Sequence, residues 1–316
     1  MRLRKWLCYG MVLCLSLVLM FGLVGCAASQ SPADQPSPKA AGTKYPVKVK
    51  DMAGEVATIK KQPERIVSLI PSNTEIAYAL HLDKEMVGVT ANDDYPPQVK
   101  KLPKVGDFNI NVEQVVALKP DLVLANTAND KQTIDRLKKL GIPVLVLGAN
   151  SIQDVYRSIN AVAKATNHTK EADQLISQME KERKEIADKI AGIPKDKRAK
   201  VWIELDPNLF TTGGDTFMNE LVTEAGGQNV AAGLKGWPKV SPEQVVKWNP
   251  DVIISFHGGE KEILSRPGWS SIQAVKNNRV YSLKPDLTNR PGPRIFQGVK
   301  QIAALLYPDR FGGKTK

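Results

Sequence analysis

The sequence predicts an α/β protein in which two parallel-sheet lobes are joined by one long α-helix. Three observations predict this fold. In each half of the chain, short apolar runs that suit strands alternate with amphipathic runs that suit helices. A single long amphipathic stretch separates the two halves. Finally, the phrase VEQVVALKPDLVL, which begins at Val112, returns as PEQVVKWNPDVII from Pro242.

The first half opens with a hairpin pattern at 47–61, and we expect its turn near Gly54. Continuous apolar runs and amphipathic runs then alternate, which is typical of a parallel sheet covered by helices on both faces. The expected strands are 65–70, 86–90, 121–126 and 143–148, and the expected helices are 72–80, 111–118, 129–141 and 151–165.

The second half repeats this alternation of short apolar runs and amphipathic stretches, so it predicts a second parallel sheet with helices. The expected strands are 200–205, 251–256 and 279–283, and the expected helices are 215–226, 241–248 and 292–306. The second lobe is therefore expected to resemble the first.

The stretch at 169–193 predicts the helix between the lobes. Its apolar residues fall on one stripe at helical spacing, while its other face is charged. A helix of about 22 residues is about 33 Å long, enough to run alongside two lobes. Ordinary core packing would give the same stripe, but its place between two α/β halves favours a connector. We therefore divide the folded part into lobes at 45–167 and 194–316, joined by a helix at 168–193.

The N-terminal segment predicts a membrane anchor. A basic start, MRLRK, precedes a long apolar run, which predicts a signal peptide at 1–25. The motif LVGC, which ends at Cys26, resembles the lipobox of bacterial lipoproteins and implies cleavage before a cysteine that carries acyl chains. An uncleaved membrane helix is the alternative. Residues 26–44 lack large apolar side chains and predict a flexible tether. We therefore expect a protein held on the extracytoplasmic face of the cell membrane by its lipid.

Composition narrows the functional classes. Cys8 and Cys14 leave with the signal, so the mature body has neither a disulfide nor a cysteine metal site. The formal charge of +11 is scattered among acidic residues without an aromatic-interleaved basic face, which argues against a nucleic-acid partner. The three histidines, His81, His168 and His257, lie far apart in the sequence, which argues against a receptor for bare zinc or manganese.

Each copy of the repeated phrase predicts a helix that leads into a strand. Asn111 and Ser241 are the expected N-caps, and Glu113 and Glu243 fall in the first turn, where a carboxylate opposes the helix dipole. Capping and packing alone could favour the phrase twice. The alternative is pseudo-symmetry, with two related lobes that each present one exposed carboxylate at an equivalent corner. Such a pair would suit docking on a symmetric partner that carries arginines.

Candidate ligand contacts follow from the positions of the strand ends, because ligands of open parallel sheets bind beyond the carboxyl ends of strands. Aromatic side chains there would give flat apolar walls, although burial in the core is the alternative for each, and polar side chains would give directed contacts. The expected ligand contacts are Asn92, Tyr95, Phe108, Asn126, Phe210, Trp237, His257, Asp286, Leu287, Thr288, Asn289 and Arg290. Ser72 also follows a strand, but it fits a capping box with Glu75, and we expect that structural role.

Several motifs, in order along the chain, resemble those of the substrate-binding proteins of ABC importers for cobalamin, iron-siderophores and heme. They are the signal and lipobox, ERIVSLIPSNTEIAYAL, DYPP, VEQVVALKPDLVLA, the central helix, WPKVSPEQVV and PGWSSIQAVKNNRVYSL. The resemblance covers nearly all of the chain beyond the tether. It implies two α/β lobes joined by a rigid helix, with the ligand in the cleft. It also implies that Glu113 and Glu243 dock on arginines of the permease dimer.

The resemblance is closest to the cobalamin-binding branch, through DYPP, WPKVSPEQV and DLTNR before PGPR. It implies that Asn92 and the run 286–290 contact a corrinoid. The chain departs from that branch at two positions, because Asn92 stands in place of a tyrosine and Asn126 in place of a tryptophan. A ferric siderophore or heme is therefore the alternative ligand, and Arg290 and Arg294 are the arginines that we can place for an anionic chelate.

An enzyme that acts on a small molecule in the cleft is the alternative from a different class. The sequence has no G-x-S-x-G elbow, no strand-linked G-x-G-x-x-G and no H-E-x-x-H motif, so we expect a receptor and not an enzyme. A surface adhesin would use the same tether, but the expected cleft argues against it. We expect a monomer without a resident cofactor, because cobalt or iron would arrive within the ligand.

Overall fold

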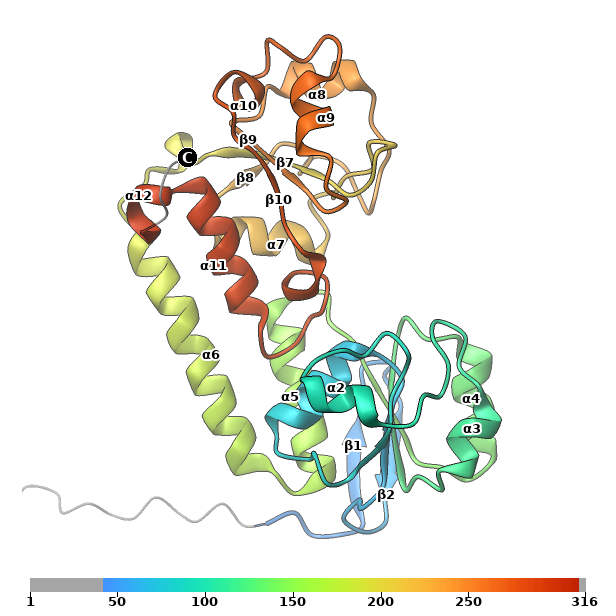
Figure 1. Ribbon diagram of the computed structural model, residues 1–316. Coiled ribbons are helices and arrows are strands. Elements are labelled where there is room, and N and C mark those ends of the chain that lie inside the picture. The colour runs from blue at the N-terminus through green and yellow to red at the C-terminus, as the bar shows by residue number, and fades with distance from the viewer. Residues whose placement is uncertain (1–41, 313–316) are drawn as a thin grey trace, which may run out of the picture. The chain divides into compact units, whose positions relative to one another are not determined.

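The computed structural model describes residues 42–312. Within this range the chain forms one antiparallel hairpin and two parallel sheets of four strands each, with helices packed around them (Figure 1). The expectations for the signal peptide, for the lipid on Cys26 and for the tether as far as residue 41 concern residues outside this described part.

The N-terminal hairpin lies where the sequence predicts it. Strands β1 (Val47–Lys50) and β2 (Val56–Ile59) pair in the antiparallel sense. Gly54 in the connecting turn has a φ of +86°, which glycine adopts without steric cost. Strand β1 packs against helix α5 (Ile152–Thr166), so the hairpin extends the N-terminal lobe.

The first parallel sheet has the strand order β4-β3-β5-β6. Its strands are almost entirely buried, which explains why they appear in the sequence as continuous apolar runs. The strands are β3 (Ile66–Ser68), β4 (Met86–Gly88), β5 (Leu122–Asn126) and β6 (Val144–Leu147), and the other helices of this half are α2 (Pro71–Ala79), the 3₁₀ turn η1 (Pro97–Lys101), α3 (Val112–Ala117) and α4 (Lys131–Lys139).

The second parallel sheet has the strand order β10-β9-β7-β8. Its strands are β7 (Lys200–Glu204), β8 (Gln228–Asn229), β9 (Val252–Ser255) and β10 (Val280–Ser282). The helices of this half are α7 (Phe217–Glu224), α8 (Pro242–Trp248), α9 (Glu260–Ser265), α10 (Gln273–Lys276), α11 (Ile295–Leu306) and α12 (Pro308–Phe311), with 3₁₀ turns η2 (Lys195–Lys197) and η3 (Pro285–Leu287). When the strands of each sheet are counted in chain order, the first sheet, read from β4 to β6, has its second, first, third and fourth strands side by side. The second sheet, read from β8 to β10, has the same order, so the two halves share one topology.

The repeated phrase folds in the same way in both halves. The side chains of Asn111 and Ser241 cap helices α3 and α8, each accepting a hydrogen bond from the backbone N–H three residues later. Both predicted N-caps are therefore confirmed. Lys119 and Asn249, which follow the last turn of each helix, share a φ of +47°, a left-handed conformation that ends the helix.

The aspartates that close the two phrases also act alike. The Asp121 carboxylate accepts from the backbone N–H of Arg65, just before β3, and the Asp251 carboxylate accepts from the backbone N–H of Lys200, which begins β7. In each half, the aspartate ties the third strand to the start of the first. The shared caps, helix ends and strand ties support pseudo-symmetry over the chance recurrence of favourable local sequence.

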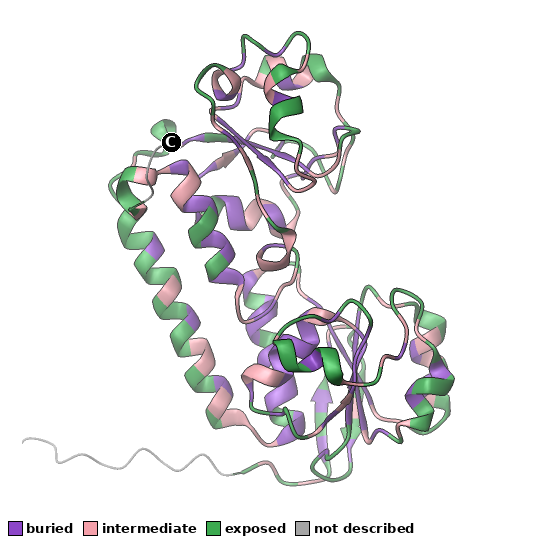
Figure 2. Ribbon diagram, viewed as in Figure 1, coloured by how far each residue is buried: buried purple, intermediate pink, exposed green. Residues whose placement is uncertain are grey.

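Helix α6 (Thr169–Ile190) matches the predicted connector. Ala172, Met179, Ile186 and Ile190 are buried along one stripe, while much of the helix is exposed (Figure 2). The helix packs against α5 of the first half and against α7, α11 and α12 of the second. Neither α6 nor any other helix within residues 42–312 has both the length and the apolar content needed to cross a bilayer.

One continuous cluster of buried side chains contains residues of both halves. It includes Ile76 and Ile159 from the first half, Met179 from α6, and Met218 and Phe296 from the second. Two smaller clusters lie under α3 and α4 and under α8 to α10. Hinge opening would have to separate apolar surfaces that are closely packed in the shared cluster, so the connection between the lobes is stiff.

Candidate functional site

Two adjoining cavities lie at the carboxyl ends of the central strands. The larger, of about 730 Å³, is bounded by residues 69–72 after β3, by 126–129 after β5, and by 285–291 of the second half. Strands β3 and β5 are neighbours whose connections leave toward opposite edges of the sheet. The cavity therefore occupies a topological switch point, which is the usual ligand position in sheets of this kind.

The smaller cavity, of about 550 Å³, belongs mainly to the second half. Its wall contains Leu205 after β7, the segment 215–218 at the start of α7, and Trp237. Both cavities share Ala149 and Asn150 on one side and Asn289 and Pro291 on the other. The two hollows are thus parts of one cleft with a wall from each sheet.

Most of the expected ligand contacts line this cleft. Two aromatic side chains in its wall are left largely open, since Phe108 is 86% exposed and Trp237 is 54% exposed. The expected contacts that line the larger cavity are Asn92, Phe108, Asn126, Asp286, Asn289 and Arg290, and those that line the smaller one are Trp237, Thr288 and Asn289.

Four expected contacts, Tyr95, Phe210, His257 and Leu287, line neither cavity. The guanidinium of Arg294 covers one face of the Tyr95 ring, 3.6 Å from its centroid. Phe210 is half-buried and pairs with Lys239 in an isolated β-bridge, and Leu287 lies in η3.

His257 is occupied by a buried carboxylate. Its Nε2 lies 2.9 Å from Oε1 of Glu204, a fully buried residue at the end of β7. Arg266 donates to both oxygens of the same carboxylate, at 2.9 and 3.0 Å. Because a buried carboxylate needs such partners, His257 acts here as a structural partner of Glu204.

The predicted capping box of Ser72 and Glu75 is wrong. Helix α2 begins at Pro71 with Ile70 in the N-cap position, so Ser72 lies inside the first turn and lines the larger cavity. Glu75 points away from the helix start toward the second half of the chain, where arginines satisfy its carboxylate. Because Pro71 occupies the first helical position, the N-cap position falls on Ile70, before Ser72.

Some residues of the cleft wall were missed in the sequence. They are Leu69, Ile70, Pro71, Asp107, Thr127, Ala128, Asn129, Ala149, Asn150, Leu205, Asp215, Thr216, Phe217, Met218, Gly236, Pro285 and Pro291. Ala149 and Asn150 lie two and three residues beyond the end of strand β6 at Leu147, so the strand-end rule would have found them. Asp215 and Gly236 come from loops whose approach to the cleft depends on tertiary folding.

An ion network joins the two halves beside the cleft. The Arg294 guanidinium donates from Nε to Oε2 of Glu75 at 2.8 Å and from Nη2 to Oε1 at 2.6 Å. Arg290 lies 2.5 Å from Asp94, 3.1 Å from Asp286 and 3.4 Å from Glu75. The Glu75 side chain is 2% exposed, so its charge depends on these partners.

The network also shifts pKa values. The hydrogen bond from Arg290, and then its charge, hold the pKa of Asp94 below the ordinary value, so Asp94 is ionised at neutral pH. Burial acts to lower the pKa of Arg290, but the hydrogen bond with Asp94 and the nearby carboxylates outweigh it and raise that pKa. For Arg294, burial is likewise outweighed by the bond and charge of Glu75, and its pKa is raised. Both guanidiniums therefore stay charged.

The two repeated glutamates are exposed in the first turns of equivalent helices, Glu113 on α3 and Glu243 on α8. Hydrogen bonds from its own backbone N–H and from the Ser241 side chain lower the pKa of Glu243. Its carboxylate is therefore ionised at neutral pH and open to a partner.

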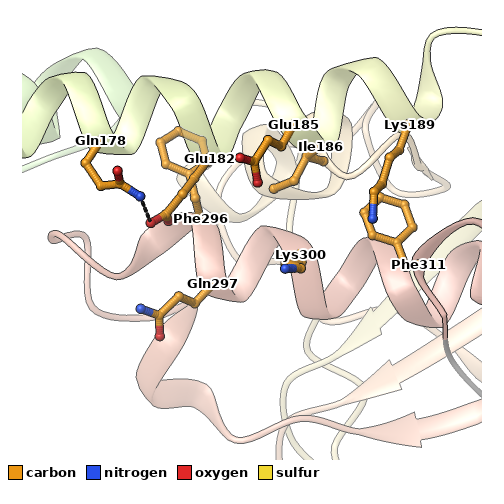
Figure 3. A pocket seen from close by; sticks show the side chains of 9 residues that line it. All are labelled: Gln178, Glu182, Glu185, Ile186, Lys189, Phe296, Gln297, Lys300 and Phe311. Carbon is orange, nitrogen blue, oxygen red and sulfur yellow. Dashed lines mark hydrogen bonds between the residues drawn. The ribbon is translucent and has the colours of Figure 1, made fainter.

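A separate groove runs between α6 and α11. Figure 3 shows Gln178, Glu182 and Glu185 of α6 on one side and residues of α11 on the other, while Lys189 of α6 lies over Phe311 of α12. Its volume is about 270 Å³, and no expected ligand contact lines it. Polar side chains cover an apolar floor there, as is usual between two packed helices. Within residues 42–312, no cluster of three or more His, Cys, Asp or Glu side chains is arranged to hold a metal ion.

The cleft, the two matched lobes and their connector can now be compared with known proteins. A family model described as periplasmic binding protein matches residues 66–287. The chain belongs to the periplasmic binding protein family. This periplasmic binding protein is 46% identical over 302 residues to a Bacillus subtilis (strain 168) protein named uncharacterized ABC transporter substrate-binding lipoprotein YvrC, and the match covers 93% of this chain and 96% of the relative.

Two further comparisons concern proteins whose names mention a ligand. The vitamin B12-binding protein of Yersinia pestis (strain Pestoides F) is 35% identical over 246 residues, which are 77% of this chain and 86% of the relative. A solved structure from Staphylococcus epidermidis ATCC 12228, described as a possible iron-binding (periplasmic solute-binding) protein, is 35% identical with a TM-score of 0.70 and covers 78% of this chain and 100% of its own.

These relatives confirm the predicted family and the fold of two α/β lobes. The protein is a substrate-binding protein of an ABC importer, a class that binds its solute and hands it to a permease, and it is not an enzyme.

Proposed function

We propose that this periplasmic binding protein captures a corrinoid in the cleft between its lobes and delivers it to the permease dimer of an ABC importer. The observation that carries the proposal is the pair of adjoining cavities at the strand ends, whose walls include Asp286, Thr288, Asn289 and Arg290 of the segment that the family resemblance assigned to corrinoid contacts. Together the cavities exceed the upper end, about 1,000 Å³, of the range usual for drug-sized ligands. A chelate as large as a corrinoid needs such room.

The wall also has suitable chemistry. Phe108 and Trp237 present open aromatic surfaces to the cleft, and Asn92, Asn126 and Asn289 bring amides that both donate and accept hydrogen bonds. A corrinoid combines a broad macrocycle with many peripheral amides, so flat walls and neutral polar groups suit it better than a cluster of cations would.

The relatives support two candidate ligands. The name of the Yersinia relative supports a corrinoid, and that of the Staphylococcus structure supports an iron compound. Asn92 and Asn126 lack the aromatic rings of the cobalamin branch, so a ferric siderophore or heme is the second candidate. Arg290 and Arg294 are already paired with the carboxylates of Asp94 and Glu75. This pairing favours the uncharged corrinoid over an anionic chelate.

Delivery would depend on the N-terminal lipid and on the two exposed glutamates. We infer that acyl chains on Cys26 hold the protein at the extracytoplasmic face of the membrane, with residues 26–44 as a tether. Glu113 and Glu243 lie at equivalent corners of matched lobes, so each could meet an arginine of one permease subunit. On this proposal the lobes are 45–167 and 194–316, with the connector at 168–193.

Calorimetric titration of the protein, purified from membranes in mild detergent, tests the ligand. We expect saturable one-to-one binding of cyanocobalamin or cobinamide with a Kd of about 1 μM or tighter, equivalent to about −8 kcal/mol. Trp237→Ala should weaken binding about tenfold or more, because it removes an aromatic wall. Leu234→Ala is the control, since this exposed apolar side chain precedes Trp237 by three residues but lines neither cavity. Binding of ferric siderophores or heme without binding of corrinoids would contradict the proposed ligand and keep the importer.

A further inference from the structure

The cleft holds more negative charge than positive charge. Within the described residues, its wall contains the carboxylates of Asp107, Asp215 and Asp286, and its one cationic side chain is Arg290. A free guanidinium would bind an anionic oxygen of a ligand by two parallel hydrogen bonds. The anion affinity of the cleft therefore depends on whether Arg290 and the neighbouring Arg294 are free.

Neither guanidinium is free. Two hydrogen bonds, at 2.6 and 2.8 Å, join Arg294 to Glu75. Arg290 is held most closely by Asp94, at 2.5 Å, and also by Asp286 of its own segment, at 3.1 Å. Glu75 and Asp94 belong to the first half of the chain and do not line either cavity, whereas the arginines belong to the second half. Both arginine side chains are largely buried, 15% and 17% exposed, and Glu75 is 2% exposed, so water screens the contact of Glu75 with Arg294 weakly. The Asp94 side chain is 48% exposed, so its contact with Arg290 is open to solvent.

We propose that Glu75 and Asp94 determine the charge selectivity of the cleft by forming ion pairs with Arg294 and Arg290. Because these pairs compensate the charge of both guanidiniums, anionic chelates are disfavoured. This inference rests on the proposed function, because it concerns the charge of the ligand that the same cleft admits. Neither carboxylate has to touch the ligand. Their effect is to occupy Arg290, the only arginine within residues 42–312 that lines either cavity, and Arg294, which shares the Glu75 carboxylate with it.

The test compares an anionic probe, a ferric tris-catecholate, with cyanocobalamin, which carries no net charge. Asp94→Asn should bind the anionic probe at least tenfold more tightly than the wild type, because it removes the closest of the three carboxylates around Arg290 and leaves Asp286 at 3.1 Å and Glu75 at 3.4 Å. Its affinity for cyanocobalamin should change less than threefold. The gain should shrink at high salt, as expected for an exposed charge contact. Glu75→Gln should shift selectivity in the same direction, and Asp94→Asn carries the test if Glu75→Gln fails to fold.

Asp107→Asn is the charge-matched comparison. Like Asp94→Asn, it removes one negative charge, here from a residue of the cleft wall. The Asp107 carboxylate accepts from the backbone N–H of Asn109 and pairs with no arginine within residues 42–312. Its gain in anion affinity should therefore be clearly smaller than that of Asp94→Asn. Equal gains in both variants, no gain in Asp94→Asn, or tight anion binding by the wild type would each overturn the inference. If the wild type binds no corrinoid, the proposed function fails, while the anion titrations still decide the role of Asp94.

Discussion

Replacing Glu113 and Glu243 together by alanine should strongly impair import while leaving ligand binding intact. Removing one partner of a desolvated charge pair at an interface costs about 2–5 kcal/mol, and each 1.4 kcal/mol is tenfold in affinity. Loss of both pairs should therefore weaken docking at least a hundredfold and reduce uptake at least tenfold. The measurement is uptake of labelled cyanocobalamin by cells in which the variant replaces the natural chain. Folding should be unaffected, since both side chains are exposed.

The matched control removes two exposed carboxylates from α6, in the variant Asp173→Ala with Glu180→Ala. It removes the same two negative charges but leaves both lobe corners unchanged, so uptake should stay close to the natural level. Single replacement of Glu113 or Glu243 should give intermediate uptake, because the other lobe would still dock. Normal uptake by the double variant at the corners would show that these glutamates do not dock.

Replacing Arg294 by methionine should have the largest effect on stability. The change leaves the buried Glu75 carboxylate without its two-point partner, and breaking a buried pair in this way costs about 3–5 kcal/mol. The measurement is the free energy of unfolding from chemical denaturation. The paired variant Glu75→Met with Arg294→Met should recover part of the loss, because it leaves no uncompensated carboxylate at that position.

Arg157→Met is the control for this second prediction. Arg157 forms an ion pair with Asp154, whose buried carboxylate also accepts from the backbone N–H of Asn150. Because the Arg157 side chain is 62% exposed and that hydrogen bond remains, the cost should be below about 1 kcal/mol. Equal destabilisation by Arg157→Met and Arg294→Met would mean that the contact between Glu75 and Arg294 contributes no more than a surface pair.

Much of the fold could be predicted because its signals are local. Continuous apolar runs mark β5 and β6, and a single stripe marks α6. The two-residue strand β8 and the four-residue helix α10 were missed, since neither is long enough to show a period. The repeated phrase predicted matched lobes, and the shared strand order agrees with it.

The candidate site was only partly predictable. The rule that ligands lie beyond strand ends found Asn126, and it also selected His257, whose position at a strand end is used for a buried pair with Glu204. Local sequence cannot distinguish these two outcomes. The partnership of Glu75 and Arg294 spans 219 positions and depends on how the halves meet, so no local pattern reveals it.

The most direct test of the proposed function is the position of cobalt in crystals grown with cyanocobalamin, located by anomalous scattering at the cobalt edge. We expect one strong peak within the cleft, between the wall of Pro71 and Asn126 and the segment 286–290. A peak only outside the cleft, or none in crystals soaked at saturating concentration, would contradict capture of a corrinoid between the lobes.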